Sequence, residues 1–295
     1  MRGPGTPTLD QMQVLVAVAD CGGLAPAARR LGRATSAISY ALDNLEAQLG
    51  ISLFERVTTR RPRLTKGGEA VLADARAVLA QVDGLKARVR GLSEGLEAEV
   101  ALAVDVMLPH ARLVDALAAF RTRFPTVALR VHAEALGGVT QLLRAGQASL
   151  GITNTDHHDA TGLEQQAAGF VRLIPVAAPD HPLARKGSRE KPQDHVQLVL
   201  TDRTPLTAGR DFGVLAGATW RLADLSTKHA LLLAGLGWGN MPDFLVRDDL
   251  KARRLVALKP DGRGGMDYRF QAVWRRDRPP GPAGRWLRAH FTAQG

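Results

Sequence analysis

The stretch "ATSAISYALDNLEAQLG", residues 34–50, decides the fold of the N-terminal part of the chain. Ile38, Leu42, Leu45 and Leu49 recur in it at steps of four, three and four, which is the spacing of one apolar face of an α-helix. The remaining face carries short polar side chains and a tyrosine, where a surface helix usually carries long charged residues. These polar positions are Thr35, Ser36, Ser39, Tyr40 and Asp43.

Two further amphipathic segments come before this helix. Apolar residues at helical spacing predict a helix over residues 9–19, which the "CGG" at 21–23 ends. A second, short helix is predicted over residues 24–31, and Gly32 then turns the chain into the third helix. Two helices, a glycine turn and a third helix within about forty residues are the signature of a helix-turn-helix.

The segment "ISLFERVTTRRPRLT", residues 51–65, predicts a small β-wing after the third helix. Leu53-Phe54 is strand-like, and residues 63–65 can return as a second strand. Arginines surround the predicted tip, and one interpretation is a solvated surface loop. Directly after a helix-turn-helix, the cluster favours contact with DNA phosphates or the minor groove. These arginines are Arg60, Arg61 and Arg63.

A long helix is predicted next, over residues 67–96, with Thr65 as its N-cap. Its apolar residues repeat at steps of four and three over three heptads, as in the a/d seam of a coiled coil. One alternative is an amphipathic helix packed on its own domain. The period of 3.5 rather than 3.6 residues favours a seam between two copies of the chain. The seam residues are Val71, Ala75, Val78, Val82, Leu85, Val89 and Leu92.

After residue 97 the pattern changes to that of an α/β domain. Residues 100–153 contain three apolar strands separated by two helices, which predicts a parallel sheet with right-handed crossovers. A second, similar unit begins near residues 169–179, and residues 268–277 with a helix around Trp286 return to the first. A cleft between two such units can hold a small molecule. The second unit's predicted elements are strands at 196–201, 218–223 and 254–260 and a helix at 227–238.

Composition indicates a basic intracellular protein. The 295 residues carry a formal net charge of +10, which favours an anionic partner, nucleic acid first. Cys21 is the only cysteine, so an intramolecular disulfide is excluded and a reducing cytoplasm is expected. Apolar runs such as "VLVAVA" at 14–19 are far below the ~18 residues that span a bilayer. We therefore expect a soluble, cytoplasmic protein without a membrane partner.

Motifs of catalysis and metal binding are missing from the sequence. There is no HExxH, CxxC, P-loop or GxSxG motif, and "GLGWG" at 235–239 is not a full dinucleotide fingerprint. His157-His158 are neighbours in a polar segment and are predicted to be solvated rather than metal-bound. The sequence thus predicts no catalytic residues, no metal and no cofactor.

Several short motifs fall in a fixed order along the chain. In the N-terminal part they are Ala27-Ala28 with Leu31, "TSAIS" at 35–39, "LE" at 45–46, "LG" at 49–50, "LFER" at 53–56, and "LT" at 64–65 with Gly68. In the C-terminal part they are "FP" at 124–125, "HPLA" at 181–184 and "AGLGWGNMP" at 234–242. In this order they resemble the LysR-type transcriptional regulators, and the resemblance covers nearly the whole chain.

The chain also departs from that family's pattern at several positions. Thr35 stands where the family usually has a glutamine before the serine of its recognition helix. Gly23-Leu24 replaces a serine-aromatic pair, and Ser149 replaces a common acidic residue. Because the change at Thr35 bears on base preference, no operator sequence is carried over.

The resemblance implies an α + α/β architecture in three parts. These are a winged helix-turn-helix (1–66), a coiled-coil dimerisation linker helix (67–96) and a two-lobed, periplasmic-binding-protein-like α/β effector domain (97–295). Lobe 1 would comprise about residues 97–167 and 268–295, and lobe 2 about 168–267. The resemblance also implies a dimer or dimer of dimers on an interrupted inverted repeat of double-stranded DNA. A small-molecule effector would bias the arrangement of subunits, and RNA polymerase is a further implied partner.

The polar face of the third helix is the predicted DNA-reading surface. Short hydroxyls and a tyrosine allow a helix to enter the major groove closely and to reach base edges and phosphates. Ser36, Ser39 and Tyr40 are the main readout candidates, and the alternative is a merely solvated face. The full set of predicted DNA-binding residues is Arg33, Thr35, Ser36, Ser39, Tyr40, Asn44, Arg56, Thr58, Arg60, Arg61 and Arg63.

Residues that follow the strands or open the helices around the cleft form the predicted effector site. Because few of them carry a fixed charge, a small, aromatic ligand is favoured over a sugar phosphate. Trp238 has a competing interpretation as a core residue. The predicted effector residues are Asp105, Met107, Leu108, Leu136, Thr153, Thr201, Asp202, Arg203, Thr227 and Trp238.

Two other functions remain open from the residues alone: a solute-binding protein, and an enzyme with a helix-turn-helix appendage. The missing export signal and the helix-turn-helix oppose the first, and the missing catalytic set opposes the second. A gel shift at two salt concentrations, with a turnover assay on any ligand found, separates all three functions.

Overall fold

The computed structural model describes residues 5–55, 62–93, 95–156, 159–185, 187–201, 203–207, 213–260, 262 and 264–293. The chain divides into two compact units, residues 1–90 and 91–295. Each unit has a hydrophobic core of its own.

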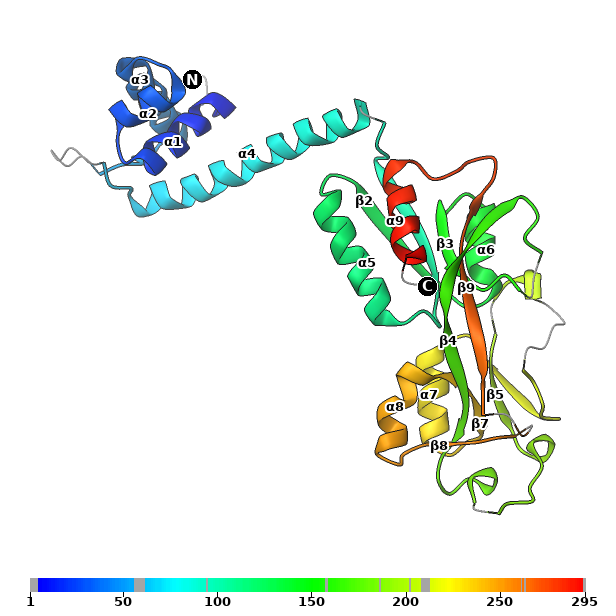
Figure 1. Ribbon diagram of the computed structural model, residues 1–295. Coiled ribbons are helices and arrows are strands. Elements are labelled where there is room, and N and C mark those ends of the chain that lie inside the picture. The colour runs from blue at the N-terminus through cyan, green and yellow to red at the C-terminus, as the bar shows by residue number, and fades with distance from the viewer. Residues whose placement is uncertain are drawn as a thin grey trace. The chain divides into compact units, whose positions relative to one another are not determined.

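The first unit begins with three helices, as predicted (Figure 1): α1 (Leu9–Cys21), α2 (Leu24–Leu31) and α3 (Thr35–Leu49). A capping box starts α1, because the Thr8 hydroxyl accepts from the Gln11 amide and the Gln11 side chain accepts from the Thr8 amide. Gly32 ends α2 in the left-handed conformation, at φ 64°, which sets the sharp turn into α3.

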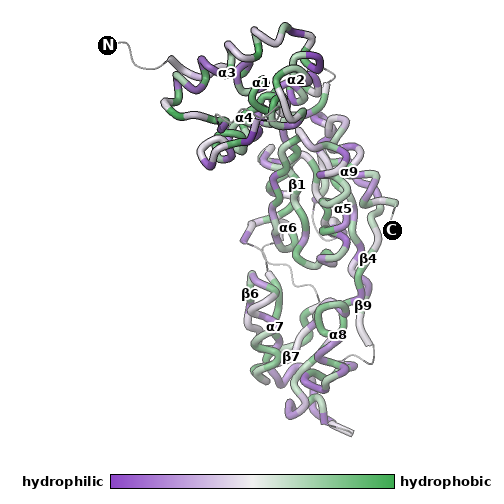
Figure 2. The backbone as a smooth tube through the Cα atoms, turned by 90° about the vertical axis from the view of Figure 1, so that its left-hand side faces the viewer, coloured by the Kyte–Doolittle hydropathy of each residue, from purple (hydrophilic) through white to green (hydrophobic). Residues whose placement is uncertain are grey.

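The apolar face of α3 packs into the core of the first unit. Ile38, Leu42 and Leu45 are buried there against α1 and α2, as the spacing predicts. Leu49, the last residue of the predicted stripe, is 36% exposed, so the buried part of the stripe ends at Leu45. Leu49 is the last residue of the helix, directly before the Gly50 cap, where the neighbouring helices no longer cover it. In Figure 2 hydrophobic and hydrophilic colours alternate along α3, whereas β1 is mainly hydrophobic.

A short β-wing follows α3. Phe54 and Leu64 form an antiparallel bridge, and the Glu55 amide donates to the Arg63 carbonyl at 2.8 Å. The Glu46 carboxylate accepts from the amides of Leu53, at 2.6 Å, and Phe54, which ties the first wing strand to α3. The two strands predicted for the wing therefore pair.

The long helix α4 (Lys66–Ser93) starts beside the wing. The Thr65 hydroxyl accepts from the Gly68 amide at 2.9 Å, which confirms the predicted N-cap. Gly68 lies so close to the wing strand that a Cβ atom there would collide with the Leu53 carbonyl oxygen. Leu72 and Ala75 of α4 are buried in the core of the first unit.

The second unit contains one mixed sheet. Its described residues form nine strands in the order β2-β1-β3-β9-β4-β7-β5-β6, with β8 paired to β4. Pairs β1–β2 and β1–β3 are parallel, which confirms the predicted parallel pairing of these strands. The strands are β1 (Glu99–Asp105), β2 (Ala128–Glu134), β3 (Leu150–Thr153), β4 (Leu163–Ala177), β5 (Gln197–Leu200), β6 (Thr219–Leu222), β7 (Trp238–Pro242), β8 (Val256–Ala257) and β9 (Met266–Arg275).

Five α-helices cover this sheet among the described residues. They are α5 (His110–Arg123), α6 (Gly137–Arg144), α7 (Leu225–Leu233), α8 (Asp243–Lys251) and α9 (Pro282–Thr292). Short 3₁₀ turns lie at Pro182–Ala184, Pro192–Asp194 and Pro205–Thr207.

The long strands β4 and β9 divide this unit into two lobes (Figure 1). The first lobe holds β1, β2 and β3 with α5, α6 and α9, and the second holds β5 to β8 with α7 and α8. β4 and β9 pair antiparallel through both lobes, with a register shift between Ala167 and Phe170. As predicted, the last strand and helix return to the first lobe.

Two predicted details of the second lobe are wrong. The helix expected over residues 227–238 ends at Leu233, because Gly235 adopts a left-handed φ of 72° just beyond it. Trp238 instead begins strand β7, where it pairs with Gln197 and Ala177. Helix α8, directly after β7, has no counterpart among the predicted elements.

Candidate functional site

The polar face of α3 is open to solvent. Thr35, Ser36 and Tyr40 are exposed, Tyr40 by 68%, and Ser39 and Asn44 are half-buried. None of these five side chains makes a hydrogen bond with a residue that the structure describes. Their donors and acceptors are therefore available to a partner outside the protein.

Arg33 has a role that the sequence did not predict. Its guanidinium forms a two-pronged ion pair with the Asp10 carboxylate at 2.9 and 2.5 Å, and this pair holds the pKa of Asp10 below its ordinary value. The contact joins the turn before α3 to the start of α1. Both side chains are about half exposed, so the pair contributes little to stability and can rearrange toward a phosphate.

The wing contributes one described cation. Arg63 is exposed, and its backbone pairs across the wing. Four other predicted DNA-binding residues lie outside the described residues: Arg56, Thr58, Arg60 and Arg61. Asp202, predicted for the effector site, and His157-His158 also lie outside them.

The predicted seam of α4 is apolar and largely uncovered in the single chain. Val78 is 38% exposed, Leu85 58%, Val89 53% and Leu92 48%. Ala75, one turn before Val78, is buried in the first unit. The first part of the seam thus packs within its own unit, whereas the later part presents hydrophobic side chains that a second helix can cover.

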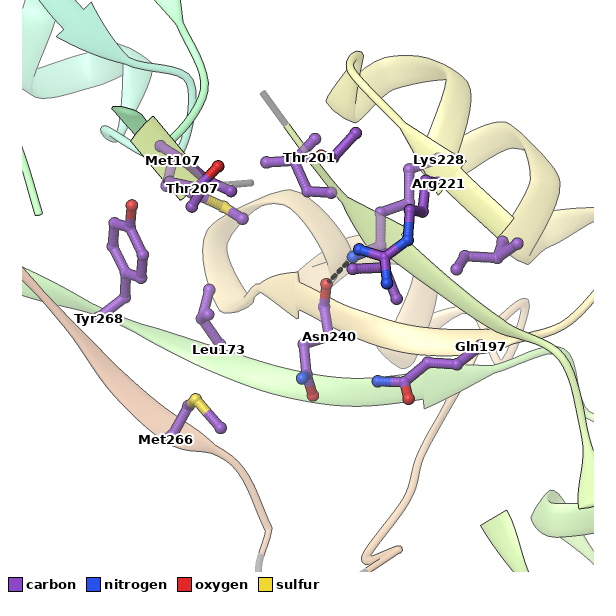
Figure 3. Close-up of a pocket in the computed structure, with 14 residues that line it drawn as sticks. Met107, Leu173, Gln197, Thr201, Thr207, Arg221, Lys228, Asn240, Met266 and Tyr268 are labelled. Carbon is purple, nitrogen blue, oxygen red and sulfur yellow. Dashed lines mark hydrogen bonds between the residues drawn. The ribbon is translucent and has the colours of Figure 1, made fainter. Parts of the chain in front are cut away.

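A cavity of about 90 Å³, called here the cleft cavity, lies between the lobes of the second unit (Figure 3). Of the predicted effector residues, Met107, Leu136 and Thr201 line it. Leu136 has a strained backbone, with φ 47°. The other lining residues are Leu173, Gln197, Leu198, Val199, Leu200, Thr207, Arg221, Lys228, Asn240, Met266 and Tyr268.

The positively charged residues of this lining were not predicted from the sequence. Lys228 is 3% exposed and donates to the Asn240 carbonyl oxygen at 2.7 Å, and Arg221 lies on the neighbouring strand β6 (Figure 3). A signal was present, because Lys228 sits between Leu225 and Leu232 on the apolar side of α7. A lysine on a buried helical stripe is unusual unless it has a partner.

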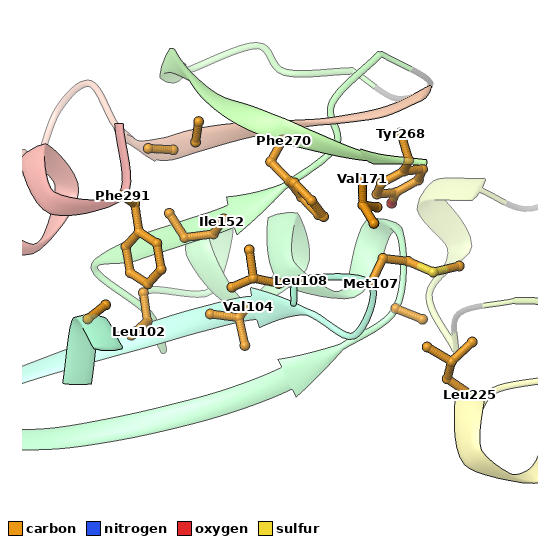
Figure 4. Packing of buried hydrophobic residues seen from close by; sticks show 14 of the residues in the cluster. Leu102, Val104, Met107, Leu108, Ile152, Val171, Leu225, Tyr268, Phe270 and Phe291 are labelled. Atoms are coloured by element: carbon orange, nitrogen blue, oxygen red, sulfur yellow. The ribbon is translucent and has the colours of Figure 1, made fainter. Parts of the chain in front are cut away.

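Asp105 occupies a buried position where β1 ends. Its carboxylate accepts from the Tyr268 hydroxyl at 2.6 Å and the Met107 amide at 2.8 Å, with the Thr153 hydroxyl at 3.5 Å. Burial raises the pKa of Asp105 to about 6, against the lowering effect of these hydrogen bonds. Figure 4 shows the apolar cluster that contains two of these neighbours, Met107 and Tyr268, and there Met107 lies near Leu225 of the second lobe.

This raised pKa predicts a loss of stability as pH rises. Because the pKa of Asp105 in the folded state is about 6, its protonated carboxyl stabilises the fold fully below the ordinary pKa of 3.8. This contribution is lost as pH rises through 6. The difference of about two units between these two pKa values corresponds to at most about 3 kcal/mol in the free energy of unfolding. In Asp105→Asn, the unfolding free energy of the second unit should lose this part of its pH dependence between pH 4 and 7.

Urea denaturation of both proteins, at one protein concentration, measures the effect. The four tryptophans, at 220, 238, 274 and 286, all lie in the second unit, so their fluorescence reports its unfolding in the full chain. Equal pH dependence in the two proteins would show that Asp105 is not the group responsible.

A second cavity, of about 300 Å³, also has lining from both lobes. Asp105 and Leu108, two predicted effector residues, line it. His229 of the second lobe lines it too, and its ring lies 2.7 Å from the Asp249 carboxylate. The other lining residues are Val104, Val106, His110, Leu113, Ala133, Asp224, Leu225, Ser226 and Leu245.

The other predicted effector residues that the structure describes line neither cavity. Trp238 is fully buried in an apolar cluster with Ala177 and Leu258, which corrects its assignment to the site in favour of the core. Thr153 is buried against Asp105, and Thr227 is exposed at the start of α7, where its amide donates to the capping Asp224. Arg203 is exposed.

The described part of the chain offers no group of three or more His, Cys, Asp or Glu residues suited to a metal ion. Within the same residues, no helix combines the length and the apolar character that crossing a membrane requires.

Comparison with known proteins covers both units. The family "Bacterial regulatory helix-turn-helix protein, lysR family" matches residues 9–69, and the family "LysR substrate binding domain" matches residues 93–295. The regulator AceR of Acinetobacter baumannii is 28% identical, over 94% of each chain. The probable regulator YhaJ of Escherichia coli is 29% identical, over 92% of this chain and 91% of that one. The solved structure of Corynebacterium glutamicum OxyR in its oxidized form has a similar fold, with a TM-score of 0.51 and 22% identity over 98% of this chain and 91% of that one.

Proposed function

Because the chain belongs to the LysR family of DNA-binding transcriptional regulators, we propose that it acts as a homodimer, or a dimer of dimers, on an interrupted inverted repeat. In this proposal residues 1–66 read DNA, the linker over residues 67–96, which contains most of α4, joins two subunits, and residues 97–295 bind an effector. The lobes divide near residue 167, where β4 has its register shift. The effector biases the arrangement of the subunits and so the transcriptional output.

The open polar face of α3 is the observation that carries the DNA-binding part of the proposal. Its five short or aromatic side chains, from Thr35 to Asn44, have no internal hydrogen bonds with described residues. Such a face can donate to and accept from base edges in the major groove. Arg63 and the arginines at 56, 60 and 61 would supply the phosphate and minor-groove contacts.

The uncovered seam of α4 supports the dimer. Val78, Leu85, Val89 and Leu92 are between 38% and 58% exposed in the single chain, yet they repeat at coiled-coil spacing. Pairing two such helices buries these side chains and brings two copies of α3 into one assembly. Two-fold symmetry in the protein then explains an inverted repeat in the DNA.

The cleft cavity is the proposed effector site. Its lining comes from the ends of β1, β5 and other strands of both lobes, so an occupant contacts both lobes at once. Three predicted residues, Met107, Leu136 and Thr201, line it. At about 90 Å³ the cavity is smaller than the ~300–1,000 Å³ of typical drug-sized sites, so it suits a compact ligand.

The chain acts in this proposal by binding rather than by catalysis. A regulator of transcription works where the DNA is, so we place the protein in the bacterial cytoplasm, with RNA polymerase as a further partner. The single cysteine suits that reducing compartment.

Filling the cleft cavity should abolish the effector response. In Met107→Trp, the larger side chain occupies the space at the first lobe's edge of the cavity. Thermal unfolding of the full chain, screened with small aromatic acids, amides and alcohols, identifies compounds that stabilise the wild type. These compounds should no longer stabilise Met107→Trp, and Thr201→Ala should respond less.

Leu113→Trp is the matched control, because Leu113 lines the second cavity and not the cleft cavity. It should keep the response. The reverse pattern, in which only Leu113→Trp loses the response, would place the effector in the second cavity and refute the assignment.

A further inference from the structure

Lys228 carries a buried positive charge, and none of the described residues offers it an acidic partner. It is 3% exposed, and its Nζ donates at 2.7 Å to the backbone carbonyl of Asn240. Within the described residues, no carboxylate lies within ion-pair distance of it. Buried charges are normally paired, because an isolated ion loses its hydration on burial.

The lysine side chain passes close to strand β7 beside the cleft cavity. At Gly239 on β7 a Cβ atom would lie 2.5 Å from the Leu198 carbonyl oxygen of β5 and 3.2 Å from the Cε of Lys228, so the glycine lets β7 approach both β5 and the lysine. Lys228 lines the cavity, and Figure 3 shows it beside Asn240 and Arg221. The ammonium is therefore held at the cavity wall rather than directed toward bulk water.

The rest of the lining has two chemically different ends. The Asn240 backbone carbonyl lies beside Lys228, the Asn240 carboxamide has no hydrogen bond with a described residue, and the Arg221 guanidinium also lines the cavity. Toward the other end in Figure 3 lie the apolar side chains of Met107, Leu173 and Met266. An occupant that satisfies both ends is negatively charged at one end and apolar at the other.

We propose that the effector is a small organic carboxylate, whose negative charge pairs with Lys228 and whose apolar body contacts Met107, Leu173 and Met266. This rests on the proposed effector site in the cleft cavity and names its ligand class. A single buried ammonium and a cavity of about 90 Å³ favour a compact monoanion. Few of the effector residues predicted from the sequence carry a fixed charge. The buried Lys228 adds a positive charge that was not predicted.

The environment of Lys228 makes this binding dependent on pH. Burial lowers its pKa to about 7, so the empty site is only partly protonated at neutral pH. A carboxylate binds the protonated form and stabilises it, so binding takes up a proton. Between pH 6.5 and 8.5 the protonated fraction of such a group falls roughly twentyfold, and carboxylate affinity should fall by up to about that factor.

The test measures the thermal unfolding of the full chain with sodium acetate and sodium benzoate. Acetamide and benzamide are the neutral probes of matched shape, and sodium phosphate tests for a response to any anion. At pH 6.5 a carboxylate should raise the unfolding temperature more than its amide and more than phosphate does, and the difference should shrink at pH 8.5. Calorimetry in two buffers of different ionisation enthalpy should show proton uptake on binding.

The variant Lys228→Met distinguishes a ligand-binding role of Lys228 from a purely structural role. Removing a buried charge that has no carboxylate partner among the described residues should raise the unfolding temperature of the ligand-free protein and abolish the preference for carboxylate over amide. A purely structural lysine would give a less stable variant instead. Lys251→Met is the control, since Lys251 is 73% exposed and distant in sequence. Lys228→Gln serves if the methionine variant does not fold.

The inference would be overturned if the amides stabilise the protein as well as the carboxylates do. It would also be overturned if the preference for carboxylate survives in Lys228→Met, or if neither carboxylate stabilises the protein at pH 6.5. Neutral compounds that stabilise the wild type but not Met107→Trp would keep the effector site and reject only its ligand class. A response to phosphate alone would show that Lys228 binds inorganic anions, and it would also reject the proposed carboxylate ligand.

Discussion

A chain carrying both Val78→Asp and Leu85→Asp is expected to be monomeric and to lose specific DNA binding. Val78 and Leu85 lie seven residues apart on the apolar seam of α4 and are 38% and 58% exposed in the single chain. If the seam joins two subunits, the substitutions place four carboxylates in one buried interface, which neither solvation nor pairing compensates. Sedimentation velocity should show one subunit where the wild type shows two or four.

Loss of the dimer should also affect DNA binding strongly, because a single subunit can contact only half of an inverted repeat. Ala80→Asp with Ala87→Asp is the matched control, since these exposed alanines have the same spacing on the opposite side of α4. That variant should remain associated. An unchanged oligomer in the seam variant would mean that α4 packs within its own chain.

The second large effect is expected from the polar face of α3. Ser39→Ala with Tyr40→Ala should weaken specific binding by roughly 1–3 kcal/mol for each base that the helix no longer reads, which is about a 5- to 150-fold decrease in affinity per base. Neither side chain has a hydrogen-bond partner among the described residues, so the fold should be unaffected. Fluorescence anisotropy with specific and random duplexes, at several salt concentrations, measures both binding constants.

Arg63→Ala should behave differently, because a phosphate contact carries no sequence information. It should weaken binding to all duplexes about equally and reduce the slope of log K against log salt by roughly 0.9. Arg60→Ala and Arg61→Ala are expected to act in the same way. Thr122→Ala on α5 is a control that should leave DNA binding unchanged. Equal binding by all variants and wild type would show that DNA lies elsewhere.

The helices of the first unit, and their order along the chain, could be predicted from local features of the sequence. The apolar spacing of α3, the glycines at 32 and 50 and the Thr65 cap are features of the sequence, and each appears in the structure. Leu49 could not be predicted in the same way, because its exposure depends on how far the neighbouring helices extend. The pairing of Arg33 with Asp10 likewise depends on how α1 and α3 pack.

The effector site was less predictable, because long-range packing builds it. Met107, Leu136 and Thr201 follow β1, β2 and β5, and the two lobes together bring the ends of these strands to the cleft cavity. Trp238 was assigned to the effector site because it lies near a crossing between the lobes, but it begins strand β7 and is buried there. Lys228 was missed because a lysine in an amphipathic helix is normally assigned to the solvent face.

Selection of DNA from a random duplex pool by the full-length chain tests the central claim most directly, namely that a dimer reads DNA with the polar face of α3. The wild type should enrich an inverted repeat whose half-site centres are separated by about 10 bp or a multiple of it. Ser39→Ala with Tyr40→Ala should enrich a half-site with altered or relaxed bases, while the repeat symmetry remains. Enrichment of no sequence by the wild type, or of the same half-site by both proteins, would contradict the account.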